Sequence, residues 1–527
     1  MSMDKIRLLD CTLRDGGYIN GWNFGYKTIK SMIARLAEAG TDIIEAGFLR
    51  NVPYDPDKTL FNSVREAKNV LPEEKKHSVF ALMALHNQYS VEKLEENDGT
   101  VDIIRVTFHN YDMDEGLDFC RRVKEKGYRL FVNPINIMGY TDGQLLELFE
   151  KVNKLGPYGF SIVDTFGSMT KAELMRIYSL CEKNLDREMV FGLHLHENLA
   201  LSFSLAQSYL ELRRDARRSV LDASLNGMGR VPGNLSIELI MDFLNRNYQA
   251  DYDIDYVLDA IEEHILPIKK TETWGYQTEY FLSAKYNLHR NYAEYFQGKG
   301  NLTTKEIKYL LRKIPEEKKS VFDEAFAEAL YQSHENRKVS DEESLLKLKG
   351  IFGGRKTVLL APGKSLLEYW PAVRAWIERE NALVVTANFF FDEWREGYAF
   401  FSNGRRFQEY KSLWKNTGRV ICTSNVAGAG EMADYVINYE RLAVPRQEKD
   451  ANCGVMLVRL MSLLGVPEVF LAGFDGFSED EDNYMPGYFG SFASARCGDN
   501  RRIAAQLRAL EDAVDIRYLT PSRYKEA

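Results

Sequence analysis

The chain has 527 residues, of which 45% are hydrophobic and 28% are charged, enough apolar material for two or three packed domains and too much for a disordered protein. Its formal net charge of -9 argues against a nucleic-acid partner, because such surfaces need clustered Lys and Arg. We find no signal core at the N-terminus and no apolar run of about 20 residues, so we expect a cytoplasmic protein without a membrane partner. The six cysteines show no C-x-x-C spacing and are expected to be reduced thiols.

Short β-rich runs alternate with amphipathic helical stretches up to about residue 225. The stretch 28–39, for example, is apolar at helical spacing and is followed by Gly40, a residue that commonly ends helices. Eight such β/α units predict a closed parallel barrel, the TIM (β/α)8 fold, in an N-terminal domain that spans residues 1–235. The eight predicted strands are 6–10, 42–48, 79–85, 103–108, 129–133, 159–164, 190–194 and 220–224.

The first and seventh predicted strands carry the residues that point to chemistry. The first strand runs into Arg14 and Asp15, which offer a hard metal ligand next to a cation that can stabilise an oxyanion. His194 and His196 share one face of the seventh strand and could converge on a metal ion, although such histidines are also found as edge or core residues. In a barrel of this kind the carboxyl ends of the strands meet at one mouth. We therefore expect a site there that contains Asp15, Glu45, His109, Asp164, His194, His196 and Asn226.

Beyond residue 235 the pattern becomes helical, and we expect residues 236–335 to form a helical extension packed on the barrel. A polar stretch, 336–350, has few large apolar residues and is predicted to be a linker. The last domain would then span 351–527. Its predicted strands, 356–361, 382–387, 419–423, 434–438 and 468–472, favour an open, doubly wound, Rossmann-like sheet.

A possible ligand site in this last domain follows its first strand. The segment Pro362-Gly-Lys-Ser365 precedes a helical run, an arrangement that can point backbone amides at a phosphate, although Val358 stands where a P-loop would need glycine. Asp475 falls at another strand end and could bind a metal, a ribose or a helix end. We expect a nucleotide or nucleotide-sugar at Gly363, Lys364, Ser365 and Asp475, with a structural or dimerising role as the alternative.

Five segments carry a resemblance to a known family. They are Asp10-Cys-Thr-Leu-Arg-Asp-Gly16, Glu45-Ala-Gly-Phe48, Asp164-Thr-Phe-Gly167, His194-Leu-His196 and Asn226-Gly-Met-Gly-Arg-Val-Pro-Gly-Asn234. In this order they resemble the metal-dependent superfamily of pyruvate aldolases, acyl-CoA lyases and isopropylmalate synthases, over about the first 290 residues. Within it the chain looks most similar to the 4-hydroxy-2-oxovalerate aldolases, partly through the tail segment Trp274-Gly-Tyr-Gln-Thr-Glu-Tyr280.

The resemblance implies a metal-dependent lyase. Asp15, His194 and His196 would hold Mn2+ or Mg2+, with Asn234 as a further ligand or as the N-cap of a following helix. The metal would act as a Lewis acid on a 2-oxo acid, and Arg14 would stabilise the enolate oxygen. The expected reaction interconverts a 4-hydroxy-2-oxo acid with pyruvate and an aldehyde, within carbohydrate or glycan biosynthesis, and we expect a homo-oligomer.

Three supporting roles have alternatives. Glu45 could touch a metal-bound water or pair with a nearby arginine, and Asp164 could hold a substrate hydroxyl or cap a turn. Gly229 belongs to a loop that either turns tightly or binds an anion through its amides.

The chain departs from the aldolase pattern at the base. Those aldolases carry a histidine three residues after the metal-binding Asp, where this chain has Tyr18, whose phenol would need a strongly lowered pKa. His109 or a metal-bound water could replace it, and Tyr280 could lie near the substrate or in the core.

Two other functions stay open at this point: an acyl-CoA-dependent Claisen condensation of the isopropylmalate synthase type, and a binding protein without activity. A Schiff-base mechanism is disfavoured because none of the eight predicted strands ends in lysine.

Overall fold

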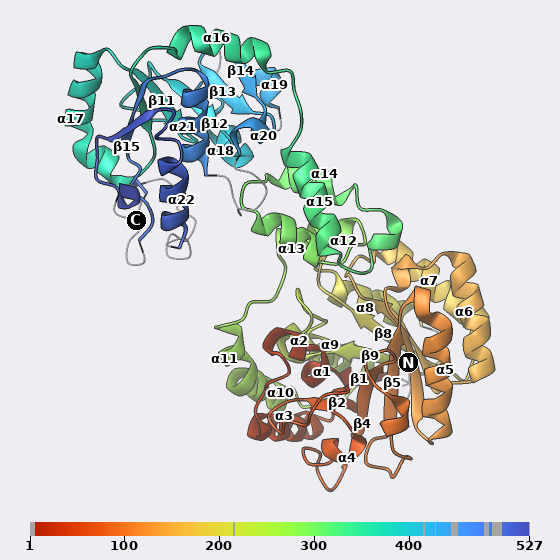
Figure 1. Cartoon of the computed structure of the whole chain (residues 1–527). Helices are drawn as coiled ribbons and strands as arrows, with labels where there is room; N and C mark the ends of the chain where they lie inside the picture. The colour runs from red at the N-terminus through yellow and green to blue at the C-terminus, as the bar shows by residue number, and fades with distance from the viewer. Residues whose placement is uncertain are drawn as a thin grey trace. The chain divides into compact units, whose positions relative to one another are not determined.

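The computed structural model describes residues 6–213, 217–414, 417–426, 428–443, 452–478, 484–486 and 498–525. The chain forms two compact units, whose helices and strands are labelled in Figure 1, where the colour follows the residue number. Unit 1 contains Met1–Glu294 and Ile314–Phe322, and unit 2 contains Tyr295–Lys313 and Asp323–Ala527.

Unit 1 is a closed parallel barrel, as predicted. Neighbouring strands pair in parallel, and β1 pairs with both β2 and β9, which closes the ring. The short strand β3 (Leu60–Phe61) pairs with β2 outside the ring. The eight barrel strands are β1 (Ile6–Asp10), β2 (Ile43–Leu49), β4 (Val79–Leu85), β5 (Ile103–Phe108), β6 (Arg129–Pro134), β7 (Gly159–Asp164), β8 (Val190–Leu195) and β9 (Ser219–Ala223).

Amphipathic helices connect most of these strands. Helix α3 (Tyr26–Glu38) buries Ile29, Met32, Ile33 and Leu36, a spacing that places them on one face of the helix. Helix α6 (Asp142–Leu155) begins with a capping box and ends at a left-handed Gly156. The other barrel helices include α1 (Thr12–Asp15), α2 (Gly17–Asn20), α4 (Val64–Ala67), α5 (Met113–Glu125), α7 (Lys171–Asn184), α8 (Ser202–Leu212) and α9 (Ile237–Tyr248). After them come α10 (Ile254–Ala260), α11 (Leu266–Lys269) and α12 (Thr278–Lys285).

Unit 2 contains a seven-stranded parallel sheet in the order β14-β13-β12-β11-β10-β15-β16. The order reverses between β10 (Thr357–Leu360) and β15 (Glu468–Ala472), as in a doubly wound, Rossmann-like sheet. The remaining strands are β11 (Leu383–Ala387), β12 (Tyr398–Phe401), β13 (Val420–Thr423), β14 (Tyr435–Ile437) and β16 (Asp515–Tyr518). The longer helices are α17 (Lys364–Glu380), α21 (Cys453–Leu463) and α22 (Asp499–Arg508).

The boundary between the units differs from the predicted linker at 336–350. Helix α16 (Glu342–Phe352) covers most of that stretch, and its Leu348 and Phe352 lie in the core of unit 2. The sequence did not reveal their burial, because most of the residues around them are charged and even the apolar Leu346 is exposed. Of the helices predicted to pack on the barrel, α14 (Thr304–Leu311) and α15 (Glu324–Glu335) belong to unit 2. No helix among the described residues is long and apolar enough to span a bilayer.

Candidate metal centre

The structure brings Asp15, His194 and His196 together at the carboxyl ends of the barrel strands. Asp15 closes α1, directly after β1, whereas His194 lies in β8 and His196 follows it. One ligand atom from each of the three side chains lies within 4.8 Å of the other two, and all three residues are buried. Residues separated by about 180 positions in the sequence thus form one candidate metal centre, because the barrel closes.

Hydrogen-bond partners behind the two histidines orient their rings. His196 Nδ1 lies 3.0 Å from the carbonyl oxygen of Asp164, which can only accept, so Nδ1 carries the proton and Nε2 keeps its lone pair. His194 Nδ1 lies 3.0 Å from Asp222 Oδ2. Such contacts are typical of metal-binding histidines, whose second nitrogen is held by a carbonyl or carboxylate. The buried His196 Nε2 has no hydrogen-bond partner among the described residues, which fits a metal ligand.

The charges at the centre also suit a cation. Burial alone would raise the pKa of Asp15, but Arg14 and His196 outweigh it and hold that pKa well below its usual range. Burial lowers the pKa of His194, against the opposing effect of Asp222. At neutral pH the centre therefore offers a carboxylate and neutral imidazole, which are the forms that bind metal ions.

Asn234 and Gly229 lie beside Asp15 at the candidate metal centre. Asn234 Oδ1 is buried without a hydrogen-bond partner in the described part of the chain, and α9 begins later, at Ile237, with Ser236 in the N-cap position. The geometry therefore favours Asn234 as a ligand over Asn234 as a helix cap. A Cβ on Gly229 would lie 2.3 Å from Asn234 Nδ2 and 2.7 Å from Asp15 Oδ2, so only glycine fits at this position.

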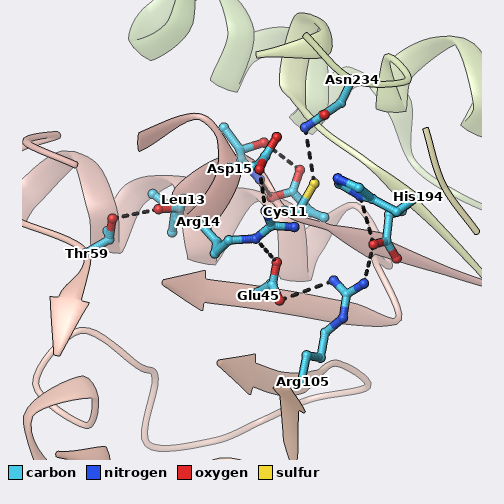
Figure 2. A network of polar contacts seen from close by, with 12 residues as sticks. Cys11, Leu13, Arg14, Asp15, Glu45, Thr59, Arg105, His194 and Asn234 are labelled. Atoms are coloured by element: carbon cyan, nitrogen blue, oxygen red, sulfur yellow. Dashed lines mark hydrogen bonds and ion pairs between the residues drawn. The ribbon is translucent and has the colours of Figure 1, made fainter. Parts of the chain in front are cut away.

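A chain of buried ion pairs runs beneath the centre (Figure 2). Glu45 accepts from Arg14 Nε at 2.6 Å and from Arg105 Nη1 at 3.2 Å, which is the arginine-partner role expected as one alternative. Arg105 also pairs with Asp222, which holds His194. Sequence analysis missed Arg105 and Asp222, although each is a single charge inside an apolar strand run.

A cavity of ≈ 350 Å³ opens above the centre, and all of its lining residues belong to unit 1. Tyr18, on α2, lines it with 39% of its surface exposed and packs edge-on against Trp22. The lining also includes Arg14, Asp15, Asn87, Gln88, His109, Tyr111, Asn133, Phe166, His194, His196, Arg230 and His289.

His109 is suited to accept a proton in this cavity. Its ring stacks on Tyr111 with centroids 4.8 Å apart, and its Nδ1 lies 3.8 Å from Asp112 Oδ2. Burial lowers the pKa of His109, more than Asp112 raises it. The imidazole is therefore neutral at pH 7, as a general base must be.

Three other predicted residues have structural contacts. The Asp164 carboxylate accepts from the backbone amides of Ser168 and Met169 at 2.9 and 3.1 Å, so it caps the turn after β7. Tyr280 is buried on α12 and is not among the lining residues, and burial raises its pKa. Asn226 accepts from Trp274 Nε1 through its carbonyl oxygen at 3.0 Å, which gives the tail segment a structural contact.

In unit 2 the four predicted residues gather where the strand order reverses. The Asp475 carboxylate accepts from the backbone amide of Ser365 at 2.9 Å and contacts its hydroxyl. A Cβ on Gly363 would lie 2.5 Å from Asp475 Cγ, whereas Lys364 is exposed. Asp475 thus binds the start of α17, which is the helix-end alternative of the sequence prediction.

Comparison with known proteins agrees with the superfamily for the barrel. Residues 5–263 match the sequence model of the HMGL-like family. A 2-isopropylmalate synthase of Streptococcus gallolyticus is 26% identical over 285 residues, 48% of this chain and 50% of the synthase. A 4-hydroxy-2-oxovalerate aldolase of Bacillus cereus is 23% identical over 269 residues, 50% of this chain and 76% of the aldolase.

Among solved structures, the N-terminal domain of a putative aldolase from Bacteroides vulgatus is 25% identical, with a TM-score of 0.48. The similarity covers 55% of this chain and 96% of that domain. This chain spans half the length of the matched synthase, and its named relatives differ in activity. The comparisons therefore show that the barrel is similar to this superfamily and leave its reaction to be proposed.

Proposed function

We propose that the HMGL-like barrel of this chain is a divalent-metal-dependent aldolase, which interconverts a 4-hydroxy-2-oxo acid with pyruvate and an aldehyde. The observation that carries this proposal is the convergence of Asp15, His194 and His196 beside Arg14 at one cavity. Mn2+ or Mg2+ suits this mixed carboxylate and imidazole set. When bound, the metal would supply Lewis-acid polarisation of the 2-oxo group.

Arg14 is positioned to stabilise negative charge that develops on the substrate. Its Nε is held by Glu45 and its Nη1 contacts Asp15, whereas the buried Nη2 has no hydrogen-bond partner among the described residues. Nη2 is therefore the donor left for an oxyanion in the cavity. Because both other nitrogens are fixed, the guanidinium needs little reorganisation when charge develops.

In the cleavage direction the 4-hydroxyl loses its proton and the C3–C4 bond breaks. The bond pair stays with C3 and forms the pyruvate enolate, C4 becomes the aldehyde carbon, and C3 then takes up a proton. His109 is the chain's best-placed acceptor for the hydroxyl proton, since its imidazole lines the cavity in the neutral form. Tyr18 lies on the same cavity and would orient the substrate through its hydroxyl.

A Claisen condensation with an acyl-CoA is the second candidate, favoured by the similarity to 2-isopropylmalate synthase. The two reactions differ in product, because only the condensation releases free CoA thiol and only aldol cleavage releases pyruvate. For unit 2 we propose a nucleotide-type ligand, supported by the reversal of strand order beside Gly363 and Asp475.

The test of the aldolase is pyruvate formation from a panel of 4-hydroxy-2-oxo acids, detected with lactate dehydrogenase. Activity should disappear with EDTA and return with Mn2+ or Mg2+, and thiol release from acyl-CoA and a 2-oxo acid is measured in parallel. Cleavage that persists after chelation would reject the metal mechanism. Thiol release without pyruvate would favour the condensing enzyme.

His196→Ala should remove both bound metal and turnover while leaving the fold intact, because His196 Nε2 lies 3.6 Å from Asp15 Oδ2 at the candidate centre and the substitution buries no new group. Metal content by mass spectrometry should fall from about one ion per chain to below one tenth. The exposed His77, before β4, gives the matched control: His77→Ala should keep both. Equal metal content in wild type and His196→Ala would contradict the assignment.

A further inference from the structure

Arg230 is a cation in the cavity without an acidic partner. Of the two arginines that line the cavity, Arg14 pairs with Glu45 and Asp15, whereas Arg230 forms no ion pair within 4.0 Å among the described residues. Its Nη2 lies 2.6 Å from His289 Nε2. Since a guanidinium can only donate, His289 accepts this bond as a neutral ring. The side chain that hydrogen-bonds the Arg230 guanidinium among the described residues thus brings no negative charge to it.

The neutrality of His289 is supported independently. The Asn291 backbone amide lies 3.3 Å from its Nδ1 and Arg230 Nη2 lies 2.6 Å from its Nε2, so a doubly protonated ring would face a donor at both nitrogens and is disfavoured. Burial, together with Arg230 and Arg290, lowers the pKa of His289 to about 3. His289 therefore positions the guanidinium and brings no negative charge to it.

The charge balance of the cavity favours an anion beside Arg230. Asp15 is the only carboxylate among the lining residues that the structure describes, and it already faces Arg14 and the two histidines. A 2-oxo acid brings one negative charge, which the metal centre and Arg14 would attract. A second, partly buried cation without a counterion is costly, and a substrate anion would offset that cost.

The position of Arg230 relates this anion to the aldehyde half of the substrate. Its backbone amide donates to Asp15 Oδ2 at 3.1 Å, which fixes the residue beside the metal centre. Its side chain extends to His289, and its Cζ lies 6.0 Å from the ring of Phe166. His109 is close enough to feel the charge of Arg230. An anion at Arg230 would therefore lie on the side of the proposed base, where the 4-hydroxyl carbon reacts.

We propose that Arg230, positioned by His289, is a specificity residue that binds a carboxylate or phosphate on the aldehyde half of the substrate. The preferred substrates are then 4-hydroxy-2-oxo acids with a second negatively charged end. A guanidinium binds either oxyanion through two parallel hydrogen bonds, so the shared chemistry is that of a terminal oxyanion. This inference rests on the proposed aldolase function and deepens it.

The first test compares kcat/KM for three 4-hydroxy-2-oxo acids of equal chain length that end in methyl, carboxylate or phosphate. The wild type should prefer one or both anionic substrates by at least about tenfold, and the favoured one identifies the oxyanion. Arg230→Met should lower kcat/KM for that substrate about 100-fold, mainly through KM, and change the methyl substrate less than about threefold. Arg230→Lys should restore part of the loss.

Arg218→Met is the matched control. Arg218 is exposed directly before β9, at the opposite end of the barrel, and donates to the Glu188 carbonyl at 2.9 Å. Arg218→Met removes the same charge from the protein and should leave the preference for anionic substrates unchanged. An equal loss in both variants would mean that net charge, and not a site at Arg230, sets the preference, and would overturn the inference.

A second test does not depend on turnover. Calorimetry with Mn2+ present compares 2-oxoglutarate with 2-oxopentanoate, which have equal chain length and differ in one carboxylate. The wild type should bind 2-oxoglutarate at least about tenfold more tightly, and Arg230→Met should abolish the difference. Pyruvate formation without any preference for charge, together with equal binding of the two acids, would overturn the inference while leaving the aldolase standing. Absence of pyruvate from every substrate would overturn the aldolase, and calorimetry would still decide the anion site.

Discussion

Gly229 shows how one backbone position controls two candidate ligands. A methyl group there would meet both Asn234 Nδ2 and Asp15 Oδ2 at less than 3.0 Å, so at least one of these side chains must move in Gly229→Ala. Displacement of groups around a metal typically weakens its binding 10- to 100-fold. We expect a loss of Mn2+ affinity of about this size, measured by calorimetry, with an unchanged circular dichroism spectrum.

The control for this substitution is Gly143→Ala. Gly143 lies in the first turn of α6, where the nearest atom to an added Cβ is 4.0 Å away and helix propensity favours alanine. Mn2+ affinity should equal that of the wild type. A similar loss in both alanine variants would show that the close contacts at Gly229 are not what matters.

His289 should make the stability of the barrel depend on pH. Its pKa is lowered to about 3 by burial and by Arg230 and Arg290, whereas an unfolded histidine titrates near 6.5. Below pH 6.5 His289 binds a proton in the unfolded chain, whereas in the folded chain it stays neutral until the pH approaches 3. The contribution of His289 is therefore complete above pH 6.5 and falls as the pH drops towards 3.

The comparison of wild type with His289→Gln isolates this effect. The difference in the free energy of unfolding should shift by up to a few kcal/mol in favour of the variant between pH 7 and pH 4, measured by urea denaturation. A difference that stays constant over this range would show that His289 is protonated in the folded state or that its ring is not held as described.

Among single residues, the sequence could predict the three candidate metal ligands, but their neighbours only in part. Asp15, His194 and His196 follow from strand register, because alternate residues of a strand share a face and strand ends meet in a barrel. The partners Arg105 and Asp222 depend on which interior side chains meet across the closed barrel, which no local pattern specifies. From the sequence, Asp164 could bind a substrate hydroxyl or cap a turn. Only the distances from its carboxylate to two backbone amides favour the turn cap.

Among the elements, β2, β5 and β9 are linked inside the barrel by one arginine. Arg105 on β5 is 1% exposed and pairs with Glu45 on β2 and Asp222 on β9. In Arg105→Met the buried Asp222 loses its arginine partner and Glu45 keeps only Arg14, which should destabilise unit 1 by about 3–5 kcal/mol. Denaturant unfolding of the full chain, followed at the transition of unit 1, would measure this loss.

The double variant Arg105→Met/Glu45→Gln is the check on that interpretation. If part of the cost comes from the Glu45 charge that Arg105 no longer offsets, adding Glu45→Gln should recover part of the stability, and the two effects should not add. Strict additivity would mean that Arg105 acts through packing of its stem alone.

The elements themselves were predicted best where periodicity is strong. All eight barrel strands lie within one or two residues of their predicted positions, since long buried runs bounded by helices leave few alternatives. The strands β12 and β16 were missed: β12 is four residues of aromatic and small side chains, and β16 is an edge strand with alternating charges. Helix α16 was mistaken for a linker because only two of its residues are fully buried.

The whole molecule contains two hydrophobic cores built from different residues, and we therefore expect two unfolding transitions. The barrel core and the core around the second sheet share no residue, and the candidate metal centre lies in the barrel alone. In calorimetry Mn2+ should raise only one transition, by about 2.7 kcal/mol at a concentration 100 times its Kd. His196→Ala should lose this shift, and a shift of both transitions by Mn2+ would mean that the units unfold together.

The path of the chain limits how the molecule can be taken apart. The segment Ile314–Phe322 belongs to unit 1, contributes Ser320 and Val321 to the cavity wall, and is flanked on both sides by residues of unit 2. A truncation at residue 294 would remove that wall, and one at residue 322 would leave 295–313 without its own core. A single stop codon therefore keeps the whole of unit 1 only together with 295–313, and engineering the barrel alone as a free module requires a shortcut spliced across 295–313.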